Sequence, residues 1–261
     1  MAYFRNAQSF YLGGTQVRQG AAGPYTLTGT LETDLLLEDL IIQTDNPHML
    51  TDVTVAGQSI FASDQAVPTT ALQPNSWLSN TGHKSMSIPL AARQQVAIQG
   101  DSAALFGPAA ASNIAFAIGT APIAPAAVIP VNQLGAEALS YVVGMGDVAV
   151  GAGGTAQLQC TIRRPVMLGA LVLDFDAGNV NDLVVRSITV NNVQMLSGET
   201  GALGEIPLGA LVPDSSDIDG KIIGYPAPLN GQISIEVFNN GAAPVQVAGC
   251  IFTLPTRPSQ G

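Results

Sequence analysis

Residues 174–182, DFDAGNVND, place several oxygen-bearing side chains close together. Asp174, Asp176, Asn179 and Asp182 lie within this one stretch, and calcium is bound by such carboxylate and amide oxygens. The pattern makes Asp174, Asp176 and Asp182 candidate calcium ligands. A solvated turn between two strands is the alternative, because Asp, Asn and Gly are the residues that turns favour.

A second acidic stretch, PDSSDIDGK (213–221), contributes the candidate calcium ligands Asp214, Asp217 and Asp219. Its spacing departs from the D-x-D-x-D-G order of a calcium-binding loop. A structural calcium ion at one of these two stretches is therefore the one cofactor that the sequence offers.

A glycine pattern at residues 142–149, VVGMGDVA, imitates the G-x-G-x-x-A fingerprint of dinucleotide-binding proteins. That chemistry requires a helix directly after the glycines, whose N-terminus meets the pyrophosphate. The residues that follow, VGAGG, cannot begin a helix. We therefore expect strand and turn here, and no cofactor-binding residues.

Catalytic constellations are not visible in the sequence. The two histidines, His48 and His83, lack the spacing of a metal site and are expected in loops, and no G-x-S-x-G elbow occurs. Cys160 and Cys250 lie in apolar, strand-like runs and are expected to be buried thiols. The sequence thus predicts no catalytic residues and a protein that is not an enzyme.

The composition is poor in charge. Only 11% of the 261 residues are charged, against roughly 25% in an average soluble domain. The net charge is −10 and the only lysines are Lys84 and Lys221, which argues against sequence-specific nucleic-acid binding. Few charges indicate that much of the surface is covered, most simply by copies of the same chain.

Membrane insertion and secretion are not expected. No apolar run reaches the roughly 18–20 residues of a membrane span. The first residues, MAYFRNAQSF, lack the pattern of a signal peptide.

The chain is an internal duplication. Residues 9–42 align without a gap on residues 140–173 at a shift of 131, with identical pairs that include Gly20/Gly151 and Gly23/Gly154. Three further segments follow in the same order: 52–61 on 187–196 at a shift of 135, 95–99 on 232–236 at 137, and 114–118 on 250–254 at 136. Four ordered matches at nearly one offset indicate two similar units of about 110–120 residues, a common domain size.

The duplication decides the secondary structure. Residues 31–42, LETDLLLEDLII, could form a helix when taken alone. Their mates at 162–173 contain Pro165 and Gly169, which disfavour a helix interior, so both copies are predicted to be strands. Short alternating runs separated by Asn-Gly, Asn-Asn and Gly-Pro continue along the chain, which is typical of all-β sandwiches and barrels.

These observations predict five regions. They are an N-terminal arm (1–8), a first domain (9–118), an Ala/Pro-rich linker (119–135), a second domain (136–255) and a C-terminal tail (256–261). The prolines of the linker favour an extended spacer.

Two all-β units in tandem, with few charges and no catalytic set, resemble the double jelly-roll major capsid proteins of tailless icosahedral viruses. The paired LTGTLETDLLLEDLIIQT and LQCTIRRPVMLGALVLDF, followed by DVTVAGQSIF and SITVNNVQML, carry this resemblance over about residues 9–255. It implies an all-β fold of two tandem jelly-roll barrels, which is a likeness of architecture, because no signature motif is present.

The resemblance also implies a function and partners. Members form homotrimers, which are pseudo-hexameric capsomers, and assemble into an icosahedral capsid that often encloses a membrane. Expected partners are therefore the chain itself, neighbouring capsomers, penton or vertex proteins, minor capsid proteins and an internal viral membrane. The location would be the virion, after synthesis in the host cytoplasm.

Two other functions remain open from the sequence. One is a tandem β-sandwich binding protein, such as a lectin-like module, a spike or an adhesin. The other is an enzyme on a double jelly roll, for example a glycan-processing amidase, which would need a carboxylate cluster between the barrels.

Overall fold

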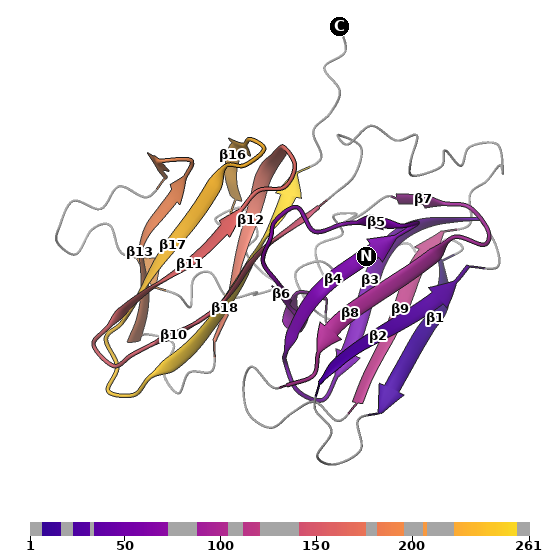
Figure 1. Cartoon of the computed structure of the whole chain (residues 1–261), viewed down its shortest axis with the longest axis horizontal. Coiled ribbons are helices and arrows are strands. Elements are labelled where there is room, and N and C mark those ends of the chain that lie inside the picture. The colour runs from indigo at the N-terminus through magenta and orange to yellow at the C-terminus, as the bar shows by residue number, and fades with distance from the viewer. Residues whose placement is uncertain are drawn as a thin grey trace, which may run out of the picture. The chain divides into compact units, whose positions relative to one another are not determined.

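The structure is a computed structural model that describes residues 7–16, 23–31, 34–72, 88–103, 112–120, 141–175, 182–195, 206–207 and 222–254. The described regular elements are β-strands, apart from one 3-10 turn, η1 (Thr69–Leu72). The chain divides into two compact units (Figure 1). Unit 1 comprises Met1–Ile60, Thr69–Tyr141 and Pro255–Gly261, and unit 2 comprises Phe61–Pro68 and Val142–Leu254. The predicted all-β fold class is confirmed.

Unit 1 contains two antiparallel sheets. The strand order of the first sheet is β1 (Ala7–Gln16), β9 (Ser112–Thr120), β3 (Leu35–Thr44) and β7 (Ile88–Leu90). The order of the second is β2 (Pro24–Thr30), β8 (Gln95–Asp101), β4 (Met49–Val55) and β5 (Gln58–Ser59). Each early strand pairs with a late one, β1 with β9 and β2 with β8, which is the nested pairing of a jelly roll.

Unit 2 repeats this arrangement. Its first sheet has the order β10 (Val142–Val150), β18 (Val245–Leu254), β12 (Val166–Phe175) and β16 (Ile222–Ala227). Its second has β11 (Thr155–Thr161), β17 (Gln232–Asn239), β13 (Leu183–Val190) and β14 (Val193–Gln194), with β15 (Ile206–Pro207) also on β13. The short strand β6 (Val67–Pro68) pairs with β4, in the sheet of β2, β8, β4 and β5, as β15 pairs with β13. Both units are therefore jelly rolls with one strand order.

The duplication extends to individual hydrogen bonds. The N–H of Ala56, in the turn after β4, donates to the carbonyl of Gln95 at 2.9 Å, and the N–H of Asn191 donates to Gln232 at 2.7 Å. Ala56 and Asn191 also share a positive φ, of 51° and 49°. The matches at shifts of 135 and 137 are thus confirmed by equivalent backbone contacts.

Residues 151–154, GAGG, form a turn in the second unit. Residues 151–154 connect β10 to β11, Gly153 has a φ of 62°, and the N–H of Gly154 donates to Gly151 at 2.9 Å. The carbonyl of Gly154 accepts from Asn239 at 2.9 Å, and the carbonyl of Gly23 accepts from Ser102 at the same distance. A strand follows instead of a helix, so the expectation of turn and strand is confirmed.

The match between the last strands is confirmed by their pairing with the first strands. Tyr11 and Val142 are equivalent at the shift of 131, and they pair with Phe116 and Phe252, which gives the predicted shift of 136. On the other side of the last strands, Ile41 pairs with Phe116 and Val172 pairs with Cys250, so the register there differs by two residues between the two units. Because side chains alternate with a period of two along a strand, this difference leaves the inward and outward pattern intact.

The cores lie between the two sheets of each unit. In unit 1, Leu27, Ile98 and Val53 occupy one inward row across three strands, and all are buried. In unit 2 the equivalent row is also buried, and it consists of Leu158, Ile235 and Ile188. Within the described residues, no helix has both the length and the apolarity that crossing a membrane would require.

Candidate functional site

The outward side of sheet β11-β17-β13 is a largely polar surface with few charges, exposed on β11 and mostly half-buried on β17 and β13, and it includes the apolar pair Val184 and Phe238. Side chains alternate along strand β11. The inward residues Leu158 and Cys160 are buried, whereas Thr155, Gln157 and Gln159 on the other side are exposed. The register of the sheet places the following side chains on the outward side: Thr155, Gln157, Gln159, Thr161, Gln232, Ser234, Glu236, Phe238, Ser187 and Thr189. We call this set the second face.

Hydrogen bonds and a cation–π contact order the second face. The side-chain amide of Gln159 donates to Oε1 of Gln157 at 2.6 Å. The guanidinium carbon of Arg186, at the bulge of β13, lies 3.6 Å from the centre of the Phe238 ring. Such a contact attracts the cation to the electron-rich ring face.

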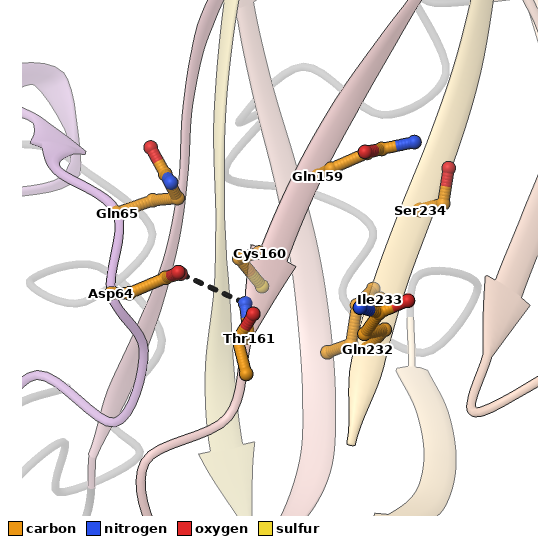
Figure 2. A pocket seen from close by; sticks show the side chains of 8 residues that line it. All are labelled: Asp64, Gln65, Gln159, Cys160, Thr161, Gln232, Ile233 and Ser234. Atoms are coloured by element: carbon orange, nitrogen blue, oxygen red, sulfur yellow. Dashed lines mark hydrogen bonds between the residues drawn. The ribbon is translucent and has the colours of Figure 1, made fainter. Parts of the chain in front are cut away.

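A cavity of about 210 Å³ opens at the end of the second face (Figure 2). It is lined by Asp64, Gln65, Gln159, Cys160, Thr161, Gln232, Ile233 and Ser234. Figure 2 shows Gln159 and Ser234 on neighbouring strands, with Asp64 and Gln65 on a separate segment across from Thr161. The lining is polar, with amide, hydroxyl and carboxylate groups that can donate or accept hydrogen bonds.

The segment that carries Asp64 and Gln65 is held by backbone hydrogen bonds within unit 2. The N–H of Ala62 donates to Val142 at 2.8 Å, and Ala62 accepts from Arg163 at 2.7 Å. The N–H of Asp64 donates to Thr161 at 3.2 Å, and Oδ1 of Asp64 accepts from the N–H of Thr161 at 2.8 Å. Residues 61–64 thus bridge the first residue of β10 and the end of β11.

Glycine at position 144 allows this segment to approach β10. A Cβ added at Gly144 would lie 2.5 Å from the carbonyl oxygen of Ala66 and would also meet the carbonyl oxygen of Gln65. The buried hydroxyl of Ser63 donates to the carbonyl of Gly144 at 2.8 Å. The bulge of β10 begins at Gly144 and ends at Gly146, whose φ is 70°. Two glycines of the supposed dinucleotide fingerprint therefore serve this close approach.

The two cysteines are buried free thiols, as the sequence predicts. The thiol of Cys160 donates to the sulfur of Met145 at 3.3 Å. Burial raises the pKa of Cys160 to about 12, with Asp64 adding to the effect, and burial also raises the pKa of Cys250. Both remain protonated at neutral pH, and a protonated thiol is a poor nucleophile.

Unit 1 has an equivalent surface on sheet β2-β8-β4. The register places the following side chains on its outward side: Thr26, Thr28, Thr30, Gln95, Ala97, Gln99, Asp52 and Thr54. We call this set the first face. Thr26, Thr28 and Thr30 are exposed, and the carboxylate of Asp52 accepts from the hydroxyl of Ser59 at 2.5 Å. Thr28 and Gln159 are equivalent at the shift of 131.

A buried polar cluster surrounds His48, which sequence reasoning did not anticipate. His48 lies between β3 and β4, as expected of a loop residue, yet its side chain is fully buried. Its Nδ1 lies 3.0 Å from the carbonyl oxygen of Asn46, and its Nε2 lies 2.7 Å from the hydroxyl of Tyr25. Because a carbonyl only accepts, Nδ1 carries the proton and Nε2 accepts from Tyr25. Burial lowers the pKa of His48.

The candidate calcium ligands fall partly outside the described residues. Asp174 is half-buried in β12, next to its last residue Phe175, and its Oδ1 accepts from the N–H of Phe175 at 2.9 Å. Asp182 precedes β13, and its carbonyl accepts from the N–H of Asn240 at 2.7 Å. The four other candidate calcium ligands lie outside the described residues: Asp176, Asp214, Asp217 and Asp219. The described part of the chain contains no group of three or more His, Cys, Asp or Glu residues that could hold a metal ion.

Comparisons with known proteins concern the fold alone. No protein-family model matches the chain, and no curated protein is significantly similar in sequence. The major capsid protein P2 of bacteriophage PM2 has 10% identity and a TM-score of 0.42, over 98% of this chain and 99% of that one. PNGase F, a glycosylasparaginase from Flavobacterium meningosepticum, has 13% identity and a TM-score of 0.36, over 97% of each chain. The structural resemblances therefore include one viral capsid protein.

The same comparison corrects the prediction that the chain is not an enzyme. Three of the similar structures are of peptide-N-glycanase or the related asparagine amidase, with 13–14% identity and TM-scores of 0.36–0.37. The absence of a recognisable motif in the sequence does not exclude enzymatic activity.

Proposed function

We propose that the chain is a viral major capsid protein, which forms homotrimers that act as pseudo-hexameric capsomers of an icosahedral shell. In this proposal its location is the virion. Its partners are copies of itself and neighbouring capsomers, penton or vertex proteins and minor capsid proteins, with an internal membrane beneath the shell.

One observation carries this proposal. The chain contains two jelly rolls of one strand order, and each presents a sheet side rich in threonine and glutamine with few charges. Jelly rolls in tandem give a trimer six similar building blocks, and jelly rolls are common in viral capsids. This argument from architecture supports a structural role.

The composition supports the same role. A shell protein covers much of each subunit with its neighbours, and permanent interfaces are less charged than free surfaces. A charged fraction of 11% and a lysine content of two residues suit a chain whose surface is largely covered.

Electron microscopy of the purified full-length chain tests the proposal, together with its mass by light scattering. Trimers with a hexagonal outline, or larger arrays and closed shells, are the expected result. A monomer that persists up to concentrations of about 1 mM would contradict it, since proteins that assemble stably associate at far lower concentrations.

The cavity beside Asp64, Gln159 and Ser234 favours one alternative, a tandem binding protein for a polar ligand such as a glycan. Its amide, hydroxyl and carboxylate groups are those that bind sugar hydroxyls by hydrogen bonds. A glycan array followed by titration tests this alternative. Saturable binding that Gln159→Ala weakens at least tenfold, and that Gln99→Ala leaves unchanged, would favour it over a shell protein.

A further inference from the structure

We propose that the side-chain amide of Asn113 binds a water molecule inside unit 1. This binding site goes beyond the proposed function and does not depend on it, because it concerns the interior of one unit and not the contacts between copies.

Asn113 is a core residue whose hydrogen-bonding groups are not used by the protein. It lies on β9 and is fully buried, and among the described residues neither its Oδ1 nor its Nδ2 has a hydrogen-bond partner. Ala115, two residues further along the same strand, is also fully buried. Buried polar groups in folded proteins almost always have a partner, either from the protein or from an ordered water. The amide of Asn113 therefore requires a partner that the described chain does not supply.

The two amide atoms specify the chemistry of this partner. Oδ1 accepts hydrogen bonds and Nδ2 donates them. A cation would serve Oδ1 alone and an anion would serve Nδ2 alone, and either would place a charge in the core at a high cost. A water molecule can donate to Oδ1 and accept from Nδ2, and it remains uncharged. The partner is therefore a small neutral molecule that both donates and accepts.

Further polar groups adjoin Asn113 at the end of β3. Asn113 pairs with Thr44, and the side chains of directly paired residues are neighbours on one side of a sheet. The hydroxyl of Thr44 donates to the carbonyl oxygen of Asn46 at 2.9 Å, and Nδ1 of His48 lies 3.0 Å from the same oxygen. A buried water makes about three hydrogen bonds, and the Thr44 hydroxyl is a suitable third group beside the amide.

Unit 2 shows that the fold does not require a polar side chain at this position. Val247 pairs with Phe175 as Asn113 pairs with Thr44, and Val247 is fully buried. Counted instead from the pairing with the first strands, the equivalent of Asn113 is Gly249, which has no side chain. In neither register does unit 2 have a polar side chain to satisfy.

The neighbouring histidine differs between the units in the same way. At the shift of 135, the equivalent of His48 is Leu183, and both residues are fully buried. Polar side chains thus replace apolar ones at one end of the unit 1 core. A bound water satisfies the amide that this replacement introduces, whereas unit 2 has no such need.

Relaxation dispersion of the oxygen-17 nuclei of water tests the inference on the full-length chain, because it counts water molecules that stay inside a protein for longer than the protein takes to tumble. Asn113→Leu replaces the amide with an apolar side chain of similar size. Asn239→Leu is the matched control. Asn239 is equally buried, but its Nδ2 donates to the carbonyls of Val150 and Ala243, and its Oδ1 accepts from the N–H of Gly241.

We expect Asn113→Leu to contain at least one long-lived water fewer than the wild type, and Asn239→Leu to contain as many as the wild type. A count that Asn113→Leu leaves unchanged would overturn the inference. The amide would then lack any partner, and its replacement by an apolar group should raise the midpoint of thermal unfolding by several degrees.

If Asn113→Leu does not fold, a crystal structure of the wild-type chain decides the question. An ordered water within about 3.2 Å of an amide atom of Asn113 supports the inference. Protein partners for both amide atoms, or the lack of an ordered water beside them, would show that it is wrong. None of these outcomes bears on assembly, which electron microscopy tests separately.

Discussion

The backbone N–H of Thr161 donates a hydrogen bond of 2.8 Å to Oδ1 of Asp64, although 97 residues separate the two in the sequence. The carbonyl of Thr161 in turn accepts from the N–H of Asp64 at 3.2 Å. Asp64 is exposed, so this pair holds the segment at the rim of the cavity and not in the core. The two hydrogen bonds between Asp64 and Thr161 therefore hold one side of the cavity in place.

Replacing Asp64 tests the strength of this pair. Asp64→Ala removes the acceptor of Thr161 and is expected to lower the free energy of unfolding by about 1 kcal/mol. Asp64→Asn keeps an oxygen at Oδ1 and should lose roughly half as much. Urea unfolding at 25 °C measures both. Equal losses in the two variants would show that the hydrogen bond to Thr161 contributes nothing.

Gly144→Ala tests the close approach of the segment to β10. The added Cβ would meet the carbonyl oxygens of Gln65 and Ala66, which are backbone atoms and cannot rotate away. We expect a loss of about 1–3 kcal/mol in the free energy of unfolding, as for overpacked sites. Gly151→Ala is the control, because a Cβ there meets nothing within 4 Å. A Gly144→Ala protein as stable as the control would contradict the described packing.

His48 predicts a pH dependence of stability. Burial holds its pKa in the folded chain below the ordinary value of 6.5, so the unfolded chain binds the proton more readily. The stability contributed by neutral His48 is therefore present above about pH 6.5 and is lost as the pH falls below that value. Protonation of Nε2 would also remove the acceptor of the Tyr25 hydroxyl.

The midpoint of thermal unfolding between pH 5 and pH 8 measures this dependence. His48→Gln removes the titrating group and keeps a polar side chain. Its midpoint is expected to be lower than that of the wild type at pH 8 and to fall less between pH 7 and pH 5. A wild-type curve that parallels that of His48→Gln would refute the role of His48.

The two cysteines are expected to react slowly with thiol reagents while the chain is folded. The pKa of Cys160 is raised to about 12 and Cys250 is fully buried, so a thiol reagent at pH 8 should modify neither in the folded chain. Both should react in denaturant. Ala152→Cys adds an exposed thiol as a positive control and should react rapidly without denaturant. Rapid stoichiometric labelling of the folded wild type would contradict the burial of both thiols.

The sequence by itself determined the duplication, the strands and the turns between them. Pro165 and Gly169 removed the helical interpretation of residues 162–173, and the repeat transferred that result to residues 31–42. Leu27 and Leu158, which are identical at the shift of 131, both lie in the cores. These features are local or repeated, so residue preferences and periodicity record them directly.

Only the tertiary structure decided which distant segments meet. It placed residues 61–68 of the first repeat in unit 2, buried His48 against Tyr25, and paired β12 with β18 in a register two residues away from that of β3 with β9. Backbone hydrogen bonds of Ala62 and Asp64 hold this segment, and because every residue except proline can make them, they leave little trace in residue types. A shift of two residues along a strand keeps each side chain on its side of the sheet, and only the pairing itself reveals it.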